Sequence, residues 1–303
     1  MKTWILITTL AFAGFAVADD LDDSFAALKK AQEGKNVEEV LTLAAQTSEL
    51  ARKEAARQKP SDADEQHWKD RMEFAKQVDS FSEYALSATA IQPGLAPAKV
   101  VELMDILLKQ NAKSQYVAQA TGVYLAALGK AGGADKQLAG ADKVLAGNPN
   151  NEDALFALAQ GNMGRSPDRA LGFANRLVTV MRSKAKPEGV SDADWNNKKN
   201  AMLGQGYYIA GAISATKQIW PDTERNIRAA LPLIGKDPGI LGPAYFYLGL
   251  ASYQMGKLTA DRAKIQEGQK YSEESAKIAG PMQAQAARNA ATIRQELATP
   301  ARR

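Results

Sequence analysis

The residues of this 303-residue sequence that could do acid–base or metal chemistry are few and scattered. Its single histidine, His67, lies three residues from both Asp64 and Asp70, which would allow a weak metal-binding or general-base role. A zinc site needs more nitrogen or sulfur ligands than one histidine supplies, and the sequence has no cysteine. We therefore expect His67 to be a surface or packed side chain, and we predict no metal site and no cofactor.

Adjacent carboxylates occur at Glu38 and Glu39 and again at Glu273 and Glu274, and carboxylate pairs are what glycosidases use. Neighbouring residues on a helix point about 100° apart, so we expect both pairs to face water. The acidic run D-D-L-D-D at residues 19–23 is a candidate calcium site. Because the helix dipole also collects acids at an N-terminus, we expect this run to begin a helix instead.

The motifs of common enzyme classes are absent from the sequence. No serine stands in G-x-S-x-G, and there is neither a P-loop nor a G-x-G-x-x-G that follows a strand. The sequence therefore predicts no catalytic residue and a protein that is not an enzyme.

The elements that must position any binding residues are marked by pairs of glycines seven residues apart. A helix that allows a neighbour to approach closely needs a small residue on its contact face, and a helix often ends at a glycine, which adopts a left-handed cap without strain. We expect the first glycine of each pair to lie at a helix contact and the second to end the helix. The pairs are Gly122 and Gly129, Gly204 and Gly211, and Gly249 and Gly256.

Apolar residues at helical spacing, with proline and glycine between them, predict about thirteen helices and no strand. We expect Ser61 to cap the third helix with Asp64 reaching back to it, and Asn151 or Asp153 to cap the seventh. The segment Asp237-Pro238-Gly239 is expected to be a turn. The expected helices span about residues 24–33, 37–57, 62–90, 98–109, 114–128, 135–146, 154–164, 166–183, 193–215, 220–233, 243–255, 260–278 and 282–297.

Two stretches of the chain are nearly identical. Residues 61–64 and 191–194 both read S-D-A-D, each with a tryptophan after it, and residues 87–89 and 214–216 both read S-A-T. The offsets of about 130 residues indicate tandem halves at residues 21–185 and 190–298, and chance matching of short words is the alternative.

The helical pairs resemble tetratricopeptide repeats, whose first helix reads W-x-x-L-G-x-x-Y. The fullest match is Leu203-Gly204-x-x-Tyr207, and Leu248-Gly249 with Tyr245 before it is the next. The repeats here run near 40 residues instead of the family's 34. The resemblance implies a right-handed α-solenoid of antiparallel helical hairpins over residues 19–298, with about six repeats, a C-terminal capping helix and a short tail at residues 299–303.

The same resemblance implies protein or peptide binding on the concave face. If first helices line that face, its residues include aromatic side chains that give contact area and amides that pair with backbone. An alternative is that the aromatic residues simply pack between repeats. The predicted contact residues are Gln119, Gln205, Tyr208, Phe246, Tyr253 and Gln254.

The first 18 residues have the three parts of a secretory signal peptide: Lys2, an apolar run at residues 4–15, and the small residues Ala16-Val17-Ala18. The alternatives are a buried first helix or a membrane anchor. We expect cleavage after Ala18 and no stable membrane span afterwards, which predicts a periplasmic or secreted protein. The net charge of +4 comes from interspersed charges, so no nucleic-acid partner is predicted.

The predicted function is therefore a non-catalytic scaffold of the cell envelope that binds a protein or peptide segment. One alternative is an enzyme, or an enzyme subunit, that acts on envelope glycan or peptide. Another is a small-ligand binder with a pocket between the halves.

Overall fold

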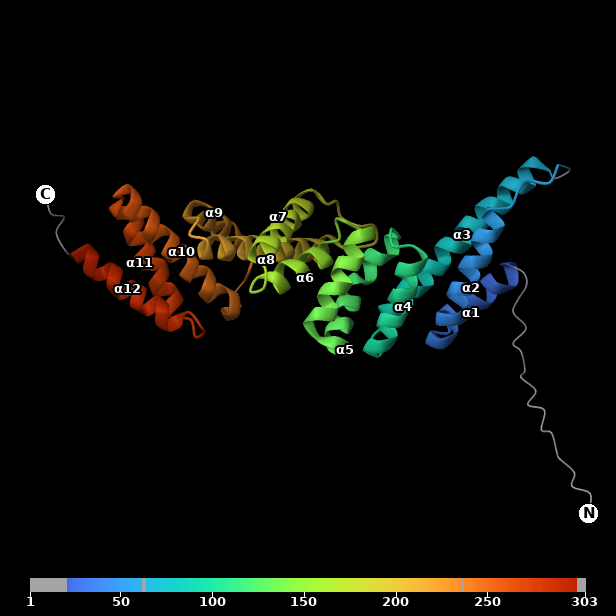
Figure 1. Ribbon diagram of the computed structural model, residues 1–303, viewed down its shortest axis with the longest axis horizontal. Coiled ribbons are helices and arrows are strands. Elements are labelled where there is room, and N and C mark those ends of the chain that lie inside the picture. The colour runs from blue at the N-terminus through green and yellow to red at the C-terminus, as the bar shows by residue number, and fades with distance from the viewer. Residues whose placement is uncertain (1–20, 62–63, 236, 299–303) are drawn as a thin grey trace, which may run out of the picture. The chain divides into compact units, whose positions relative to one another are not determined.

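The computed structural model describes residues 21–61, 64–235 and 237–298, and within these ranges the chain is all-helical (Figure 1). Twelve helices and no strand occur there, which confirms the predicted all-helical class. The predicted signal peptide and the tail at residues 299–303 lie outside the described ranges. The helices are α1 (Leu21–Glu33), α2 (Val37–Ala55), α3 (Glu65–Ala90), α4 (Pro97–Gln110), α5 (Gln115–Gly147), α6 (Glu152–Asn162), α7 (Pro167–Ser183), α8 (Asp192–Thr216), α9 (Trp220–Ala230), α10 (Pro238–Thr259), α11 (Arg262–Ala276) and α12 (Gln283–Ala298).

Two of the expected helices, at residues 114–128 and 135–146, lie within one helix, α5. The glycine-rich segment at residues 131–133 was predicted to be a turn between two helices, but only Gly133 departs from helical geometry, with φ 75° and ψ −173°. Glycine adopts a positive φ without the steric penalty of a Cβ. The chain therefore bends at one residue, and the two predicted helices are the two arms of α5.

The structure shows which residues cap the N-termini of α3 and α6. Asp64, and not Ser61, caps α3, because its carboxylate accepts a hydrogen bond from the backbone N–H of His67 at 2.8 Å. Asn151 caps α6 by accepting from the backbone N–H of Ala154 at 3.0 Å. The prediction for Ser61 was wrong because an acid three residues later offered an equally good cap next to the first apolar turn.

The predicted turn at residues 237–239 is the first turn of α10. Asp237 is the N-cap, with its carboxylate 2.9 Å from the backbone nitrogen of Gly239, and Pro238 is the first helical residue. Proline suits that position because its fixed φ is helical and its missing N–H would have no partner there. Pro243, where the helix was expected to begin, lies inside it.

The second glycine of each pair lies inside a helix, so the prediction that it ends the helix was wrong. Gly129 is within α5, Gly211 within α8 and Gly256 within α10. The left-handed residues that follow α8 and α10 are Gln218, with φ 59°, and Ala260, with φ 54°. A glycine inside a helix costs about 1 kcal/mol relative to alanine, and the close packing described next offsets that cost.

Both members of the last two pairs lie where helices approach closely. A Cβ on Gly211 would lie 2.6 Å from Cδ1 of Ile227 on α9, and one on Gly204 would lie 3.0 Å from Cβ of Leu233. The contact between α10 and α11 is the tightest of these, since Cβ atoms on Gly249 and Gly256 would lie 2.9 and 2.8 Å from backbone nitrogens of α11. Gly122 differs, because it is exposed and lies at no such contact.

The chain forms two compact units, one up to Tyr124 and the other from Leu125 on. In the first unit, consecutive helices from α1 to α4 pack together, and α1 also contacts α3 while α2 contacts α4. Its core includes Leu28, Leu86 and Leu103, which are fully buried. The division into halves near residue 185 concerns duplication, which compactness does not test, so it stays a prediction.

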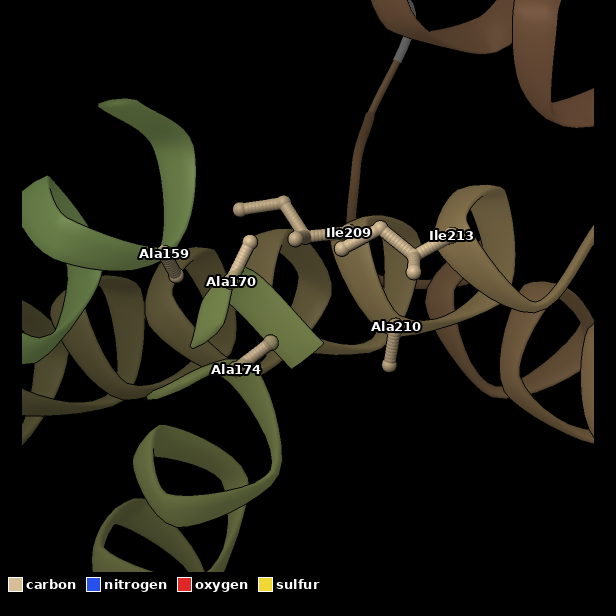
Figure 2. Close-up of a cluster of buried hydrophobic side chains, with 6 residues drawn as sticks. All are labelled: Ala159, Ala170, Ala174, Ile209, Ala210 and Ile213. Carbon is tan, nitrogen blue, oxygen red and sulfur yellow. The ribbon is translucent and has the colours of Figure 1, made fainter. Parts of the chain in front are cut away.

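In the second unit, each helix from α6 to α12 packs against the next one along the chain, and α6, α8, α10 and α12 also contact one another in that order. Figure 2 shows one buried cluster, in which Ala159 of α6 and the alanines of α7 meet Ile209, Ala210 and Ile213 of α8. The small alanine side chains leave room for the larger isoleucines. The result is a core built from neighbouring helices.

Candidate functional site

The six predicted contact residues are divided between the two units. Gln119 lies on α5 in the first unit and is exposed, whereas the other five lie on α8 and α10 in the second unit and are partly exposed. Helices α8 and α10 contact each other. Gln205 and Tyr208 therefore come from the helix next to the one that carries Phe246, Tyr253 and Gln254.

Tyr208 has a clear packing role. Its ring contacts a cluster that includes Ala210 and a second one that includes Ile227 and Leu248. Burial, with a smaller contribution from Tyr247, raises the pKa of Tyr208 to about 12. The phenol therefore stays neutral, and packing between helices, the alternative considered for this residue, accounts for its position.

Tyr253 is tied to the last helix. Its hydroxyl donates a hydrogen bond to a carboxylate oxygen of Glu296 on α12 at 2.6 Å, and Lys257 Nζ lies 5.4 Å from the centroid of its ring. Burial and the Glu296 carboxylate raise the pKa of the Tyr253 phenol. Tyr253 was predicted to contact a partner. Its hydroxyl and part of its ring surface instead contact Glu296 and Lys257 of the same chain.

The most continuous run of aromatic contacts lies in the first unit, and the sequence did not predict it as a site. Phe25 of α1 meets Phe74 and Phe81 of α3 edge to face, with ring centroids 5.7 and 5.3 Å apart. Phe81 lies 5.7 Å from Tyr84, and Tyr84 lies 5.7 Å from Tyr116 of α5. We call these five residues the ring row. It connects three helices that are distant in sequence.

The ring row leads to exposed apolar residues. Tyr84 is 38% exposed, and one heptad further along α3 comes Ile91, which is 46% exposed. One heptad after Tyr116 on α5 comes Val123, which is 40% exposed. Residues seven apart on a helix lie on the same side, and exposed Gln119 lies between Tyr116 and Val123. We call Tyr84, Ile91, Tyr116, Gln119 and Val123 the open face.

A hydrogen bond fixes α3 against α5 beneath the open face. The hydroxyl of Ser87 donates to the backbone carbonyl of Tyr116 at 2.9 Å. At the far end of this arm of α5, the hydroxyl of Tyr124 donates to the Asp105 carboxylate of α4 at 2.9 Å. Burial, followed by this carboxylate, raises the pKa of Tyr124. The exposed residues are thus held on a rigid support.

A signal for the open face is present in the sequence of α3. The helix has one fully buried stripe, which includes Ala75, Val78 and Leu86, and its aromatic residues lie beside that stripe. Apolar residues on two sides of one helix exceed what a single core contact needs.

The second unit contains a cluster of charged side chains that could be mistaken for a catalytic site. The buried Glu152 carboxylate at the start of α6 pairs with Lys184 after α7 and lies 2.9 Å from Lys198 Nζ of α8. Asp153 lies 3.2 Å from the same Lys198 nitrogen. Each carboxylate has a lysine partner, so the cluster joins three helices and needs no ligand to balance it.

Two opposing influences set the pKa values in this cluster. Burial alone would raise the pKa of Glu152, but hydrogen bonds from Lys184 and Lys198 outweigh burial, and the pKa lies below its ordinary value. Burial dominates at Asp153 and raises its pKa. The charges of Asp153 and Glu152 raise the pKa of Lys198 despite burial. Carboxylates with divergent pKa values occur at acid–base sites, and structural ion-pair networks produce them too.

The other residues considered for chemistry are exposed or partly exposed. His67 is exposed, and within the described ranges no three histidine, aspartate or glutamate side chains lie close enough to hold a metal ion together. Glu38 pairs with Lys99, while Glu273 and Glu274 pair with Arg294 and Lys277. The carboxylates of Glu273 and Glu274 therefore diverge toward separate basic partners.

No protein-family model matches the sequence, and no curated protein matches it significantly. Each helix of the described ranges is too short or too polar to cross a membrane. The function proposed below therefore rests on the residues and their geometry.

Proposed function

We propose that this protein is a non-catalytic interaction module of the cell envelope that binds a protein segment. In this proposal the helices stack as a tetratricopeptide-like solenoid, and the segment lies along helices that pack side by side. The observation that carries the proposal is the open face, in which the exposed side chains of Tyr84, Ile91 and Val123 belong to segments joined by the hydrogen bond from Ser87 to Tyr116 and by the contact between the Tyr84 and Tyr116 rings. Exposed apolar side chains that gather on one surface mark interaction sites.

The packing of the second unit supports the stacked arrangement. Helices α6, α8, α10 and α12 pack closely against one another in order, whereas α9 and α11 meet through long side chains, in the ion pairs of Arg228 with Glu267 and of Lys264 with Glu224. A stack whose helices pack more closely on one side than on the other curves toward the closely packed side. This arrangement is expected of a solenoid with α6, α8, α10 and α12 on its concave side.

The environment of Gly204 supports the resemblance to tetratricopeptide repeats. In the matching segment Leu203-Gly204-x-x-Tyr207, the glycine would allow a second helix to approach. A Cβ at Gly204 would lie 3.1 Å from the backbone carbonyl carbon of Leu233 and 3.2 Å from a methyl carbon of Ile234. The glycine of the motif therefore lies where the chain that follows the paired helix crosses it.

The binding proposal is tested by capture of partners from an envelope extract with the purified chain from Asp19 on. We expect Tyr84→Ala combined with Val123→Ala to reduce the captured protein by about tenfold, since interface hot spots are commonly worth 1–2 kcal/mol or more. The matched control is Ile219→Ala, because Ile219 is apolar and 41% exposed but lies just before α9, outside the open face and outside the helices of the proposed concave side. Equal capture by both variants would contradict the proposal.

The proposed location is tested separately. Export with cleavage after Ala18 predicts that the protein recovered from the producing cell begins at Asp19 and fractionates with the periplasm or the medium. N-terminal sequencing of the recovered protein makes the measurement. A protein that retains residues 1–18 and stays in the cytoplasm would refute the proposed location. It would not affect the proposal that the open face binds a protein segment.

A further inference from the structure

Charged residues avoid the open face. Residues 84–91 of α3 and 115–124 of α5 contain no Asp, Glu, Lys or Arg. The nearest carboxylate on α3, Glu83, is buried and accepts a hydrogen bond from the side chain of Asn111 at 2.9 Å. The nearest exposed charge on the other side is Lys113, before α5 begins. In a chain of which 24% is charged, this is a distinct neutral surface.

The helices behind the open face have the opposite composition. Helix α2 carries acids and bases near both of its ends, and α4 carries them along its length. Many of these charges form ion pairs across helices, such as Arg52 with Asp79 at 3.0 Å and Lys99 with Glu38 at 2.8 Å. Charged side chains are thus common on α2 and α4, whereas residues 84–91 and 115–124 have none.

The second unit shows the same separation independently. Helix α10 has one charged residue, Lys257, among its 22 residues, whereas α11 has six among 15. Helix α8 has no charged residue after Lys199. The predicted contact residues Gln205 and Phe246 lie in these neutral stretches. Both units thus place uncharged residues where the proposed function expects a partner.

The rings themselves argue against a sugar ligand, which stacks on an open ring face. The Tyr84 ring of the open face contacts Phe81 at an interplanar angle of 50° and Tyr116 at 65°, with both pairs of centroids 5.7 Å apart. Aromatic neighbours therefore already occupy part of the surface of the Tyr84 ring. Ring edges and the aliphatic side chains Ile91 and Val123 remain available.

From these observations we propose that the open face binds an uncharged, apolar polypeptide segment, and that it does so without ion pairs. The inference rests on the proposed function and specifies the chemistry of the partner. Apolar side chains of the segment contact Tyr84, Ile91 and Val123, and the amide of Gln119 pairs with its backbone. A charged segment would lose hydration at this surface and find no opposite charge to compensate.

The test uses the chain from Asp19 on and a set of fluorescent, end-capped synthetic peptides of equal length. All peptides share the same leucine and phenylalanine positions, and the positions between them are serine and glutamine, lysine, or glutamate. We expect the neutral peptide to bind at least about tenfold more tightly than either charged peptide. Its Kd should change by less than about twofold between about 0.1 and 1 M salt, although the Debye length falls from about 10 to 3 Å.

A charge placed on the open face provides the matched control. Gln119 is exposed, so Gln119→Glu should leave the fold intact. We expect this variant to bind the lysine peptide more tightly than the wild-type protein does, and to do so only at low salt. Tyr84→Ala with Val123→Ala should abolish binding of the neutral peptide, whereas Ile219→Ala should not.

The outcomes separate the inference from the proposed function. Binding that requires lysine or glutamate in the peptide, or that salt removes from the wild-type protein, would overturn the inference and leave the function standing. If no peptide binds and neutral oligosaccharides do, both fail. Self-association that Tyr84→Ala with Val123→Ala abolishes, measured by sedimentation velocity, would assign the open face to a second copy and overturn the inference.

Discussion

Glu152 is a buried carboxylate whose desolvation is offset by ion pairs. Its side chain is 6% exposed and interacts with two lysines. A buried carboxylate of this kind costs free energy to desolvate, and its partners return that energy only while they stay in place. The paired cluster is therefore expected to fasten α6, α7 and α8 together without taking part in a reaction.

We predict that Glu152→Gln lowers the free energy of unfolding at pH 7 by about 1–3 kcal/mol, because a neutral amide replaces a buried carboxylate that pairs with two partly exposed lysines. The folded pKa of Glu152 lies below the value of 4.5, so its stabilisation is present above that value. The stabilisation is lost as pH falls through the lowered folded pKa. Urea titrations across this range should show the difference between variant and wild type shrinking below pH 4.5.

The control for this experiment is Glu49→Gln. Glu49 is 68% exposed and pairs with Lys53 one turn away on the same helix, and such solvated surface pairs contribute little to stability. If Glu49→Gln lowers the stability as much as Glu152→Gln does, the change in the net charge of the protein, and not the loss of the paired cluster, accounts for the effect.

Variants of Tyr208 can distinguish a role in packing between helices from a role in binding a partner. We predict that Tyr208→Ala lowers the free energy of unfolding by about 2–4 kcal/mol, as expected for a large, mostly buried ring. Tyr208→Phe keeps the ring and should change it by less than about 0.5 kcal/mol. If Tyr208→Ala leaves stability unchanged and weakens partner binding, the original assignment of Tyr208 to a binding surface is correct.

The ionisation of Tyr208 offers a second measurement. Its pKa is raised from 10.0 to about 12, so the unfolded chain loses this proton at lower pH than the folded one. The contribution to stability is complete below about pH 10 and is lost as pH rises toward 12. Phenolate absorbance of the wild type minus that of Tyr208→Phe reports the titration.

At the scale of elements, glycine determines how closely α10 and α11 pack. We predict that Gly249→Ala destabilises the protein by about 1–3 kcal/mol, since its Cβ would lie 2.8 Å from Oγ and 2.9 Å from the backbone nitrogen of Ser272. Gly172→Ala on α7 is the matched control, because nothing lies within 4 Å of its Cβ position. It should stabilise the protein by about 0.5–1 kcal/mol. Thermal unfolding of both variants measures the contrast.

Helices were predictable from sequence because their evidence is local. Apolar spacing and proline positions placed each expected helix close to an observed one, and Asn151 caps α6 as one of two predicted choices. The structural role of each glycine could not be predicted from local sequence. Gly211 can end a helix or admit a neighbour, and only the position of Ile227 on another helix decides which.

The candidate site was less predictable than the helices, again for a physical reason. Exposure depends on what covers a side chain, and the sequence does not state which apolar stripe of α3 the neighbouring helices use. Tyr84 and Val123 are separated by 39 positions in the chain, and it is the contact between Tyr84 and Tyr116 that connects their helices. Gln119 was predicted as a partner contact and is exposed, while the aromatic residues beside it were not predicted as part of a site.

At the scale of the whole molecule, the chain forms two compact units, and each unit contains fully buried side chains. Contacts in each run mainly between helices that neighbour one another along the chain. Arrays of this kind gain stability from nearest-neighbour packing, so a defect is felt mostly by the helices around it. Unfolding of the chain should therefore not be a single two-state event.

We predict that Leu103→Ala and Leu248→Ala affect different parts of the protein. Leu103 in the first unit and Leu248 in the second are both fully buried, and each truncation should cost about 2–5 kcal/mol. Hydrogen exchange should show lost protection in α2, α3 and α4 for Leu103→Ala, with α8, α9 and α10 unchanged, and the reverse for Leu248→Ala. Equal loss of protection throughout the chain in either variant would mean that the two cores unfold as one, and the nearest-neighbour account of stability would then be wrong.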